Sequence, residues 1–277
     1  MSKGAPNNPT ENDRITAEEI APYLSPPLSG TNVLVYGSLP STNDTAKELA
    51  MAGAAAGTTV IAEKQTMGKG RNGRSFYSPP ACGIYLSMIL RPSISLSQLL
   101  LLTSGVAVAS AKAIEEVNDC SVEIKWVNDL YLRGKKVAGI LLESALGGGV
   151  TDYVVAGIGV NVTEPEEGFP AELAEKAGAV CVNGESLSRN RLAAGLINNI
   201  WAMAELLKSQ SVAYVPALID EVRRRSCVLG RDITITGAEG LSAGRAVEID
   251  GQGFLVVEGR DGRRHTLSGG EVSITAF

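Results

Sequence analysis

Histidine is almost absent from this sequence, which contains only His265. A metal cage built from several histidines is therefore excluded, and a Ser-His-Asp triad would depend on this one residue. The four cysteines lie far apart and form no Cys-x-x-Cys pair, which argues against zinc ribbons and redox dithiols. We therefore expect reduced, mostly buried thiols and a cytoplasmic protein.

Long hydrophobic runs are also lacking. The longest uncharged stretch, residues 92–111, is interrupted by serine, threonine and glutamine, and the N-terminal residues carry no apolar segment of the signal-peptide type. Neither secretion nor a membrane span is expected. The net charge of −5 means that the chain as a whole would be repelled by nucleic-acid phosphates and by anionic membranes. Any cationic site must therefore be local.

The 277 residues correspond to about two domains. Residues 1–30 have the pattern of a polar tail and a short helix, and 31–225 alternate helical and strand patterns. Expected helices lie at 42–51, 99–117 and 192–207, and expected strands at 33–37, 58–64, 84–90, 123–132, 135–144 and 151–162. Residues 226–277 predict a small SH3-like β-barrel of five short strands between glycines. The predicted fold class is α+β.

The segment 64–74, KQTMGKGRNGR, combines three glycines with four basic residues and contains no acid. Glycine lets a backbone approach a ligand closely, and the basic side chains favour an anion. The spacing matches neither a P-loop nor a Rossmann fingerprint. For this segment alone, a solvated hairpin tip is the alternative interpretation.

Two further segments have ordinary structural interpretations when each is taken alone. In KWVNDL, residues 125–130, Asn128 and Asp129 are typical of an Asx turn and Trp126 is typical of a core residue. In STND, residues 41–44, the pattern predicts a helix N-cap. A helix N-terminus also binds polar or anionic groups.

In their order along the chain, these segments resemble one family, the biotin protein ligases. The resemblance runs from about residue 33 to the C-terminus. The matching segments are STN at 41–43, Gln65 with GKGRNGR at 68–74 (GRGRxGR in the family), KWVNDL at 125–130 (KWPNDL), Lys136 followed by AGIL, GIGVN at 157–161 (GIGxN) and GGEVSIT at 269–275 (GGExS).

This resemblance implies a two-step reaction. Biotin and MgATP give biotinyl-5′-AMP and pyrophosphate, and a lysine of a biotin carboxyl carrier protein, from acetyl-CoA carboxylase or a related carboxylase, then accepts the biotinyl group. The implied fold is a mixed-sheet catalytic domain related to class II tRNA synthetases, followed by an SH3-like domain. No winged helix is expected, so the resemblance points to the monofunctional class without a nucleic-acid or membrane partner. A homodimer is compatible with the sequence.

The resemblance also implies roles for single residues. Those that would contact biotin or its adenylate are Ser41, Thr42, Asn43, Gln65, Lys69, Gly70, Arg71, Lys136 and Gly139. Those that would contact the nucleotide are Lys125, Asn128, Asn161 and Phe76, the last as a cover for the adenine. Arg71 and Lys136 would supply catalytic positive charge at the α-phosphate. Asp129 would hold the acceptor lysine and help it lose its proton, and it is the nearest candidate for Mg²⁺; no other metal site is expected.

Three positions depart from the family pattern: Val127 replaces a proline, Lys69 an arginine and Asn72 a basic residue. These changes weaken the loop's charge without removing Arg71. The sequence also leaves rival functions open. They are a lipoate or octanoate ligase with the same adenylate chemistry, a nucleic-acid-binding module that uses the Gly/Arg loop, and a catalytically silent biotin sensor.

Overall fold

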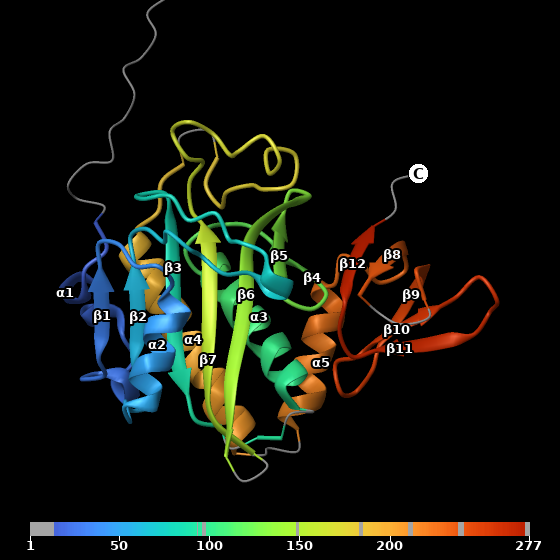
Figure 1. Ribbon diagram of the computed structural model, residues 1–277, viewed down its shortest axis with the longest axis horizontal. Helices are drawn as coiled ribbons and strands as arrows, with labels where there is room; N and C mark the ends of the chain where they lie inside the picture. Colours follow the sequence, from blue (N-terminus) through green and yellow to red (C-terminus); the bar gives the residue numbers. More distant parts are fainter. Residues whose placement is uncertain are drawn as a thin grey trace, which may run out of the picture.

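A seven-stranded mixed sheet runs through the larger part of the protein (Figure 1), in the order β1-β2-β3-β7-β6-β5-β4. The computed structural model describes residues 14–92, 94–95, 98–147, 150–182, 185–209, 213–237 and 241–274, so the predicted polar tail lies outside the described residues. Among the described strands of this sheet, β1 (Val33–Tyr36) and β2 (Thr59–Ala62) are the one parallel pair, and β2 also takes part in an antiparallel pair. The strands that pair antiparallel are β3 (Gly83–Leu90), β4 (Glu123–Lys125), β5 (Asp129–Leu132), β6 (Lys135–Gly147) and β7 (Val150–Asn161).

Helices cover both faces of this sheet (Figure 1). α2 (Thr42–Met51) packs on one face, and α3 (Leu99–Glu115), α4 (Arg189–Lys208) and α5 (Tyr214–Arg225) lie on the other. α3 is buried on nearly every side, although its spacing predicts a one-sided helix. Its small residues explain this, because they let α4 approach closely: a Cβ atom at Gly105 would lie 2.6 Å from Met203 Sδ.

Strand alternation divides the core into two clusters. Even-numbered residues of β3 and β7, such as Leu86 and Ile158, join the main core beneath α3 and α4. The odd-numbered residues Ile89 and Val155 pack with α2 in a smaller cluster. Further along the same face, β7 carries glycine instead of a side chain, and the face becomes hollow there.

The N-terminal helical pattern forms less helix than its length suggests. α1 (Ala17–Ile20) passes directly into the short 3₁₀ helices η2 (Ala21–Tyr23) and η3 (Pro26–Leu28). Proline in η2 and η3 lacks the N–H that an α-helix interior needs. The segment is nevertheless well attached, because Asn190 of α4 accepts a hydrogen bond from the Thr16 backbone N–H at 3.0 Å.

The prediction of one strand over residues 123–132 is wrong. The chain turns at 126–128, so β4 and β5 pair antiparallel with Lys125 opposite Asp129. Asn128 fixes the turn: its Nδ2 donates to the Ile140 carbonyl, and its own carbonyl accepts from the Ile140 N–H, both at 2.9 Å. Trp126 Nε1 donates to the Gly253 carbonyl at 3.0 Å, and the peptide bond between Trp126 and Val127 is cis.

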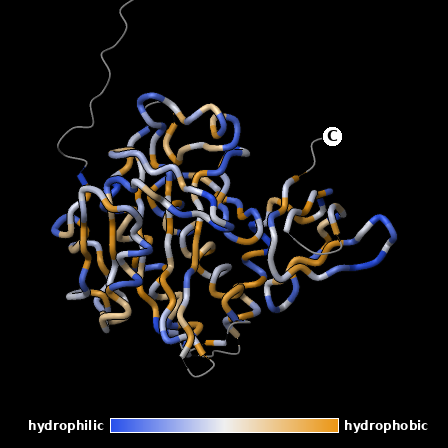
Figure 2. The backbone as a smooth tube through the Cα atoms, viewed as in Figure 1, coloured by the Kyte–Doolittle hydropathy of each residue, from blue (hydrophilic) through white to orange (hydrophobic). Residues whose placement is uncertain are grey.

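The C-terminal residues form a separate five-stranded antiparallel sheet in the order β11-β10-β9-β8-β12, as expected for an SH3-like unit. Its strands are β8 (Asp232–Thr236), β9 (Ala243–Ile249), β10 (Leu255–Glu258), β11 (Arg264–Leu267) and β12 (Glu271–Ile274). In Figure 2 hydrophobic colour follows the strands and helices of both units, and hydrophilic colour marks the projecting β10–β11 hairpin. None of the helices in the described ranges is both long and apolar enough to cross a bilayer.

The end of α5 is tied to the larger sheet by a buried arginine. The side chain of Arg225 is 5% exposed, and its guanidinium contacts Glu115 at 2.6 Å and Glu221 at 2.7 Å. It also donates to the Val122 carbonyl at 3.0 Å. Arg225 therefore joins α3, α5 and the chain that enters β4.

We predict that Arg225→Ala lowers the free energy of unfolding by about 2 to 3 kcal/mol, because it leaves the partly buried Glu115 carboxylate without its guanidinium partner, while Glu221 keeps its contact with Arg224. Arg224→Ala is the matched control: Arg224 contacts the same Glu221 but is 61% exposed, so its loss should cost less than about 1 kcal/mol. Chemical denaturation measures both. Equal losses for the two variants would contradict the assigned role of Arg225.

Candidate active site

The hollow face of the sheet forms a cavity between the start of α2, the glycine-rich loop and the strands β6 and β7. Residues from four separate parts of the chain meet there. The cavity is lined by Ser41, Thr42, Asn43, Gln65, Lys69, Gly70, Arg71, Phe76, Asn128, Lys136, Gly139, Ile140, Leu141, Gly157, Ile158 and Gly159. Most of the residues that the sequence assigned to biotin and nucleotide binding are therefore neighbours in space.

The N-terminus of α2 is capped by a residue distant in sequence. Ser41 occupies the N-cap position but makes no side-chain capping bond. Gln65 does this instead, because its Oε1 accepts hydrogen bonds from the Thr42 N–H at 2.8 Å and from the Thr42 hydroxyl at 3.1 Å. Gln65 Nε2 donates to Ser78 Oγ at 3.0 Å. The chain before the glycine-rich loop is thereby fixed to α2.

Asn43 lies deep in the cavity and approaches β7 very closely. A Cβ atom at Gly157 would lie 2.0 Å from Asn43 Oδ1, so only glycine fits at that position. Asn43 Oδ1 accepts from the buried Ser87 hydroxyl at 2.6 Å, and Asn43 Nδ2 donates to Glu143 at 2.8 Å. Every polar atom of the Asn43 side chain is satisfied, which holds it rigidly.

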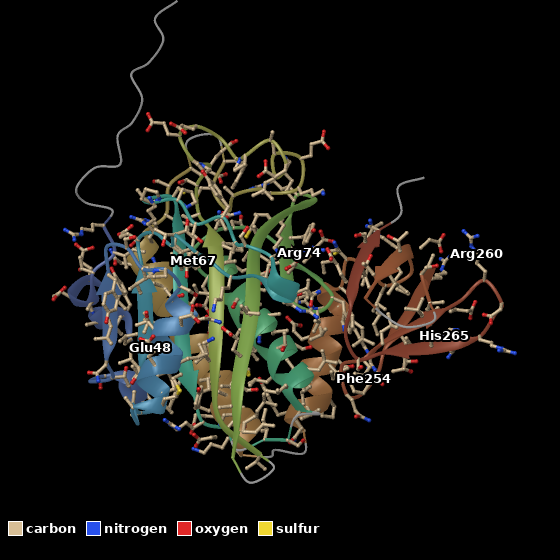
Figure 3. All side chains as sticks on the ribbon, in the orientation of Figure 1. Glu48, Met67, Arg74, Phe254, Arg260 and His265 are labelled. Atoms are coloured by element: carbon tan, nitrogen blue, oxygen red, sulfur yellow. The ribbon has the colours of Figure 1, made fainter. Side chains whose placement is uncertain are left out.

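The glycine-rich loop contacts the C-terminal sheet. Arg71 donates to Asn128 Oδ1 at 2.9 Å and to the Gly270 carbonyl at 3.5 Å. Arg74, which points toward β12 in Figure 3, pairs with Glu271 through both of its terminal nitrogens. This guanidinium holds the pKa of Glu271 below its usual range. The two arginines therefore connect the loop to β12 and to the residue before it.

Lys136 reaches the cavity because β6 contains a bulge. Tyr131 pairs with Lys136 but Leu130 pairs with Ala138, so Val137 is an extra residue. The bulge brings Lys136 onto the same side as Gly139, and a Cβ atom at Gly139 would lie 3.3 Å from Lys136 Nζ. Lys136 Nζ is 2.7 Å from Asp129 Oδ1, and both side chains are largely shielded from solvent. This ion pair orients the ammonium group.

Phe76 separates the cavity from a larger groove. Its ring lies against the glycine face of β7, where a Cβ atom at Gly159 would be 2.4 Å from the ring. Tyr85 supports it in an edge-to-face contact with ring centroids 6.4 Å apart. The groove beyond shares Gln65 and Phe76 with the cavity, and its other wall is acidic, with Glu164, Glu166, Glu167 and Glu172.

Three predicted site residues do not line this cavity. Lys125 lies over the ring of Tyr131, with Nζ 5.5 Å from the ring centroid. Asn161 Nδ2 donates to the Gly178 carbonyl at 3.0 Å and so holds the segment after β7. Asp129 reaches the cavity only through Lys136. The direct ligand contacts expected of these three residues stay predictions.

The sequence did not identify the residues that position Asn43 and Phe76 in the cavity. Gly157 and Gly159 stand two apart in a strand of otherwise bulky residues, which is a signal of close approach on one face. Ser87 is the one polar residue in the apolar strand β3 and faces the same side. Glu143 carried no signal in the sequence, because its partners come from α2.

The residues present do not form a metal site of their own. Within the described ranges, no group of three or more His, Cys, Asp or Glu side chains is placed to hold an ion. Asp129, the carboxylate predicted to lie near Mg²⁺, is already paired with Lys136. A magnesium ion in this site would need most of its ligands from substrate phosphates and water.

Two sequence families match the chain. The family described as "Biotin/lipoate A/B protein ligase family" matches residues 35–161, and the "Biotin protein ligase C terminal domain" matches residues 228–274. The first family covers the strands and the loop that build the cavity, and the second covers most of the C-terminal sheet. The fold and the site thus define a ligase of the biotin/lipoate class.

Individual relatives show to which branch of this class the chain belongs. The "Bifunctional ligase/repressor BirA" of Bacillus subtilis (strain 168) is 33% identical over 257 residues, which cover 92% of this chain and 78% of the relative. The "Biotin--[acetyl-CoA-carboxylase] ligase" of Mycobacterium tuberculosis (strain ATCC 25618 / H37Rv) is 32% identical, with 78% of each chain covered. The biotin protein ligase of Aquifex aeolicus, solved with biotin and ATP, superposes with a TM-score of 0.74 at 26% identity, over 88% of this chain and 98% of that one. The chain belongs to the biotin protein ligase family.

We predict that Gly157→Ala weakens biotin binding at least ten-fold, because the added methyl group must displace Asn43. Overpacking of this kind should also lower the free energy of unfolding by about 1 to 3 kcal/mol. Gly37→Ala is the matched control, since no atom lies within 4 Å of a Cβ at that position. Titration calorimetry with biotin and thermal unfolding measure the two effects. Unchanged biotin affinity in Gly157→Ala would show that Asn43 does not shape the site.

Proposed function

We propose that this chain activates biotin with ATP to biotinyl-5′-AMP and transfers the biotinyl group to a lysine of a biotin carboxyl carrier protein. The observation that carries this proposal is the single cavity that joins the α2 N-terminus, the basic glycine-rich loop and Lys136. It offers hydrogen-bonding groups at one end and positive charge at the other. Biotin has the matching chemistry, with a polar, uncharged ring system and a carboxylate tail.

The neutral end of biotin lies at the start of α2. Ser41, Thr42 and Asn43 are each less than 5% exposed, so the groups that they present are held in a dry, fixed frame. Gln65 and Ser87 hold this frame through their bonds to Thr42 and Asn43. A frame fixed in advance loses little conformational entropy when the ligand binds.

In the first step, a biotin carboxylate oxygen attacks the α-phosphorus of ATP. The new bond is O–P, and the bond to the bridging oxygen of the β-phosphate breaks, so pyrophosphate leaves. Two anions are forced together, and one cation at about 4 Å can offset about 4 kcal/mol at an effective dielectric constant of about 20. Lys136 and Arg71, which both line the cavity, supply this charge.

The phosphate chain of ATP lies toward the cleft that the glycine-rich loop forms with β6, the start of α3 and the C-terminal residues Phe254 and Ser268. This cleft shares Lys69, Gly70 and Arg71 with the cavity and is also lined by Arg74. The groove on the other side of Phe76 carries four glutamates, which would repel a triphosphate. Magnesium, carried by the phosphates, would add positive charge there.

In the second step, the carrier lysine attacks the carbonyl carbon of the adenylate as a neutral amine. An amide C–N bond forms, the bond to the phosphate oxygen breaks, and AMP leaves. Asp129 is the carboxylate nearest to Lys136 and accepts a proton from the incoming ammonium group.

Pyrophosphate release that requires biotin, followed by mass-spectrometric detection of a biotinylated carrier lysine, tests the proposal. Lipoate offered in place of biotin separates the two branches of the ligase family. Pyrophosphate release with lipoate alone would overturn the choice of substrate, and biotin binding without any release would indicate a silent sensor.

We predict that Lys136→Ala slows adenylate formation by about two to three decades, because negative charge is most concentrated in the transition state. The variant should lose less biotin affinity, since the groups at α2 remain. Lys135→Ala is the matched control: Lys135 Nζ donates to the Ala174 carbonyl instead of facing the cavity, so its rate should change less than about three-fold. Single-turnover kinetics measure the rate of adenylate formation in both variants. Equal rates would show that Lys136 has no catalytic role.

We also predict that Arg71→Gly releases biotinyl-5′-AMP faster than the unaltered chain while still forming it. The substitution removes the link from the loop to Asn128 and to the Gly270 carbonyl. Escaped adenylate would label lysines of bystander proteins, which a blot for biotin detects. A variant that forms no adenylate, or that holds it as tightly as before, would refute this role of Arg71.

A further inference from the structure

The glycine-rich loop is attached to α2 as well as to the C-terminal sheet. Lys69 Nζ lies 2.6 Å from Asp44 Oδ1, in the first turn of α2. Lys69 also lines the cavity, so the position of its side chain and backbone defines part of the cavity wall. The attachment to α2 therefore bears directly on how the cavity is closed.

Asp44 belongs to a row of alternating charges. Lys47 Nζ is 3.0 Å from Asp44 Oδ1 and 2.7 Å from Glu143 Oε1. The other oxygen of Glu143 accepts from Asn43 Nδ2 at 2.8 Å. Continuous contacts thus connect Asn43 on the cavity floor to Lys69 in the loop.

The middle of this row is partly shielded from solvent. The side chains of Lys47 and Glu143 are 26% and 27% exposed, against 40% for Lys69. Burial lowers the pKa of Lys47, but its bonds to the two carboxylates outweigh this and raise the pKa overall. Burial likewise opposes ionisation of Asp44, but the two lysines hold its pKa below the usual value. Both groups are charged at neutral pH, so the row is intact there.

We propose that Asp44 is a positioning residue that fixes Lys69, and with it the glycine-rich loop, in place over the bound adenylate. Lys47 and Glu143 link the Asp44 side chain to that of Asn43 and so hold it in a fixed position. This inference rests on the proposed function and extends it to the retention of the intermediate. An isolated exposed ion pair contributes little to stability. Here Asp44 and Lys47 each contact two charged partners, and a network of this kind fixes its side chains more firmly.

Asp44→Asn tests the proposal, because it removes the charge and keeps the shape. We expect biotinyl-5′-AMP to dissociate about three- to ten-fold faster, while biotin-dependent pyrophosphate formation in a single turnover changes less than about two-fold. Lys69→Gln should speed the dissociation of biotinyl-5′-AMP by a similar factor, and dissociation from the double variant should be no faster than from the faster single variant. Asp44→Glu keeps the charge, so biotinyl-5′-AMP should dissociate from it almost as slowly as from the unaltered chain. High salt screens the ion pairs, so it should reduce the difference in dissociation rate between Asp44→Asn and the unaltered chain.

Glu48→Gln is the matched control, since Glu48 is an exposed acid on the same helix, marked in Figure 3. It removes the same charge from α2 without a contact to the loop, so retention should not change. Unchanged dissociation in Asp44→Asn, an equal effect of Glu48→Gln, or additive losses in the double variant would overturn the inference.

Limited trypsin digestion provides a readout that does not depend on the reaction. The bond after Arg71 should be cut at least about three-fold faster in Asp44→Asn than in the unaltered chain, because the loop opens more often. Equal cleavage rates would refute the positioning role even if no adenylate is formed. Faster cleavage in a chain that forms no adenylate would support the role of Asp44 in the loop and refute the proposed function alone.

Discussion

The contact of α2 with the bare face of β7 is the constraint on which the site depends. Asn43 can reach the strand only because Gly157 has no side chain, and Phe76 can lie beside it only because Gly159 has none. Both glycines therefore shape the cavity because they have no side chain to fill it. With α2 seated in this way, its first turn meets Gln65, and the chain that enters the glycine-rich loop is fixed at the same point.

Electrostatics imposes the second constraint. The protein carries a net charge of −5, yet its substrates are anions. The positive charge at the cavity comes from one loop and one strand start, and nearby acids match much of it. Asp44 faces Lys69, Asp129 faces Lys136 and Glu271 faces Arg74. These carboxylates hold long, flexible side chains in place, which reduces the entropy that the side chains lose when the ligand binds.

The C-terminal unit contacts two segments that line the site and is more than an appended unit. Its Gly253 carbonyl accepts from Trp126 next to the turn that carries Asn128, and its Gly270 carbonyl accepts from Arg71. The loop thus lies between α2 on one side and β12 on the other. A loop held at both ends can cover a reactive intermediate and still open, because each attachment is made of only a few exposed polar contacts.

Much of the architecture could be predicted from the sequence. Strand alternation located β3, β6 and β7, apolar spacing located α3 and α4, and ordered motifs placed the cavity residues from α2, the loop and β6 in one site. The break between β4 and β5 was missed although Asn128 and Asp129 are typical of an Asx turn, because the apolar residues on both sides favour one continuous strand. The contact of Asn128 with Ile140, which holds the turn, is a tertiary contact that the segment alone does not reveal.

By itself, the sequence determined which chemistry this protein could carry: no histidine cluster, no dithiol, one basic glycine-rich loop and a pair of lysines at the start of a strand. Tertiary structure decided which of these groups meet. A strict two-residue alternation would place Lys136 and Gly139 on opposite faces of β6, and only the bulge at Val137, set by pairing with β5, brings them together. The links from Lys69 to Asp44 and from Arg74 to Glu271 span 25 and 197 residues, so only packing of the whole chain creates them.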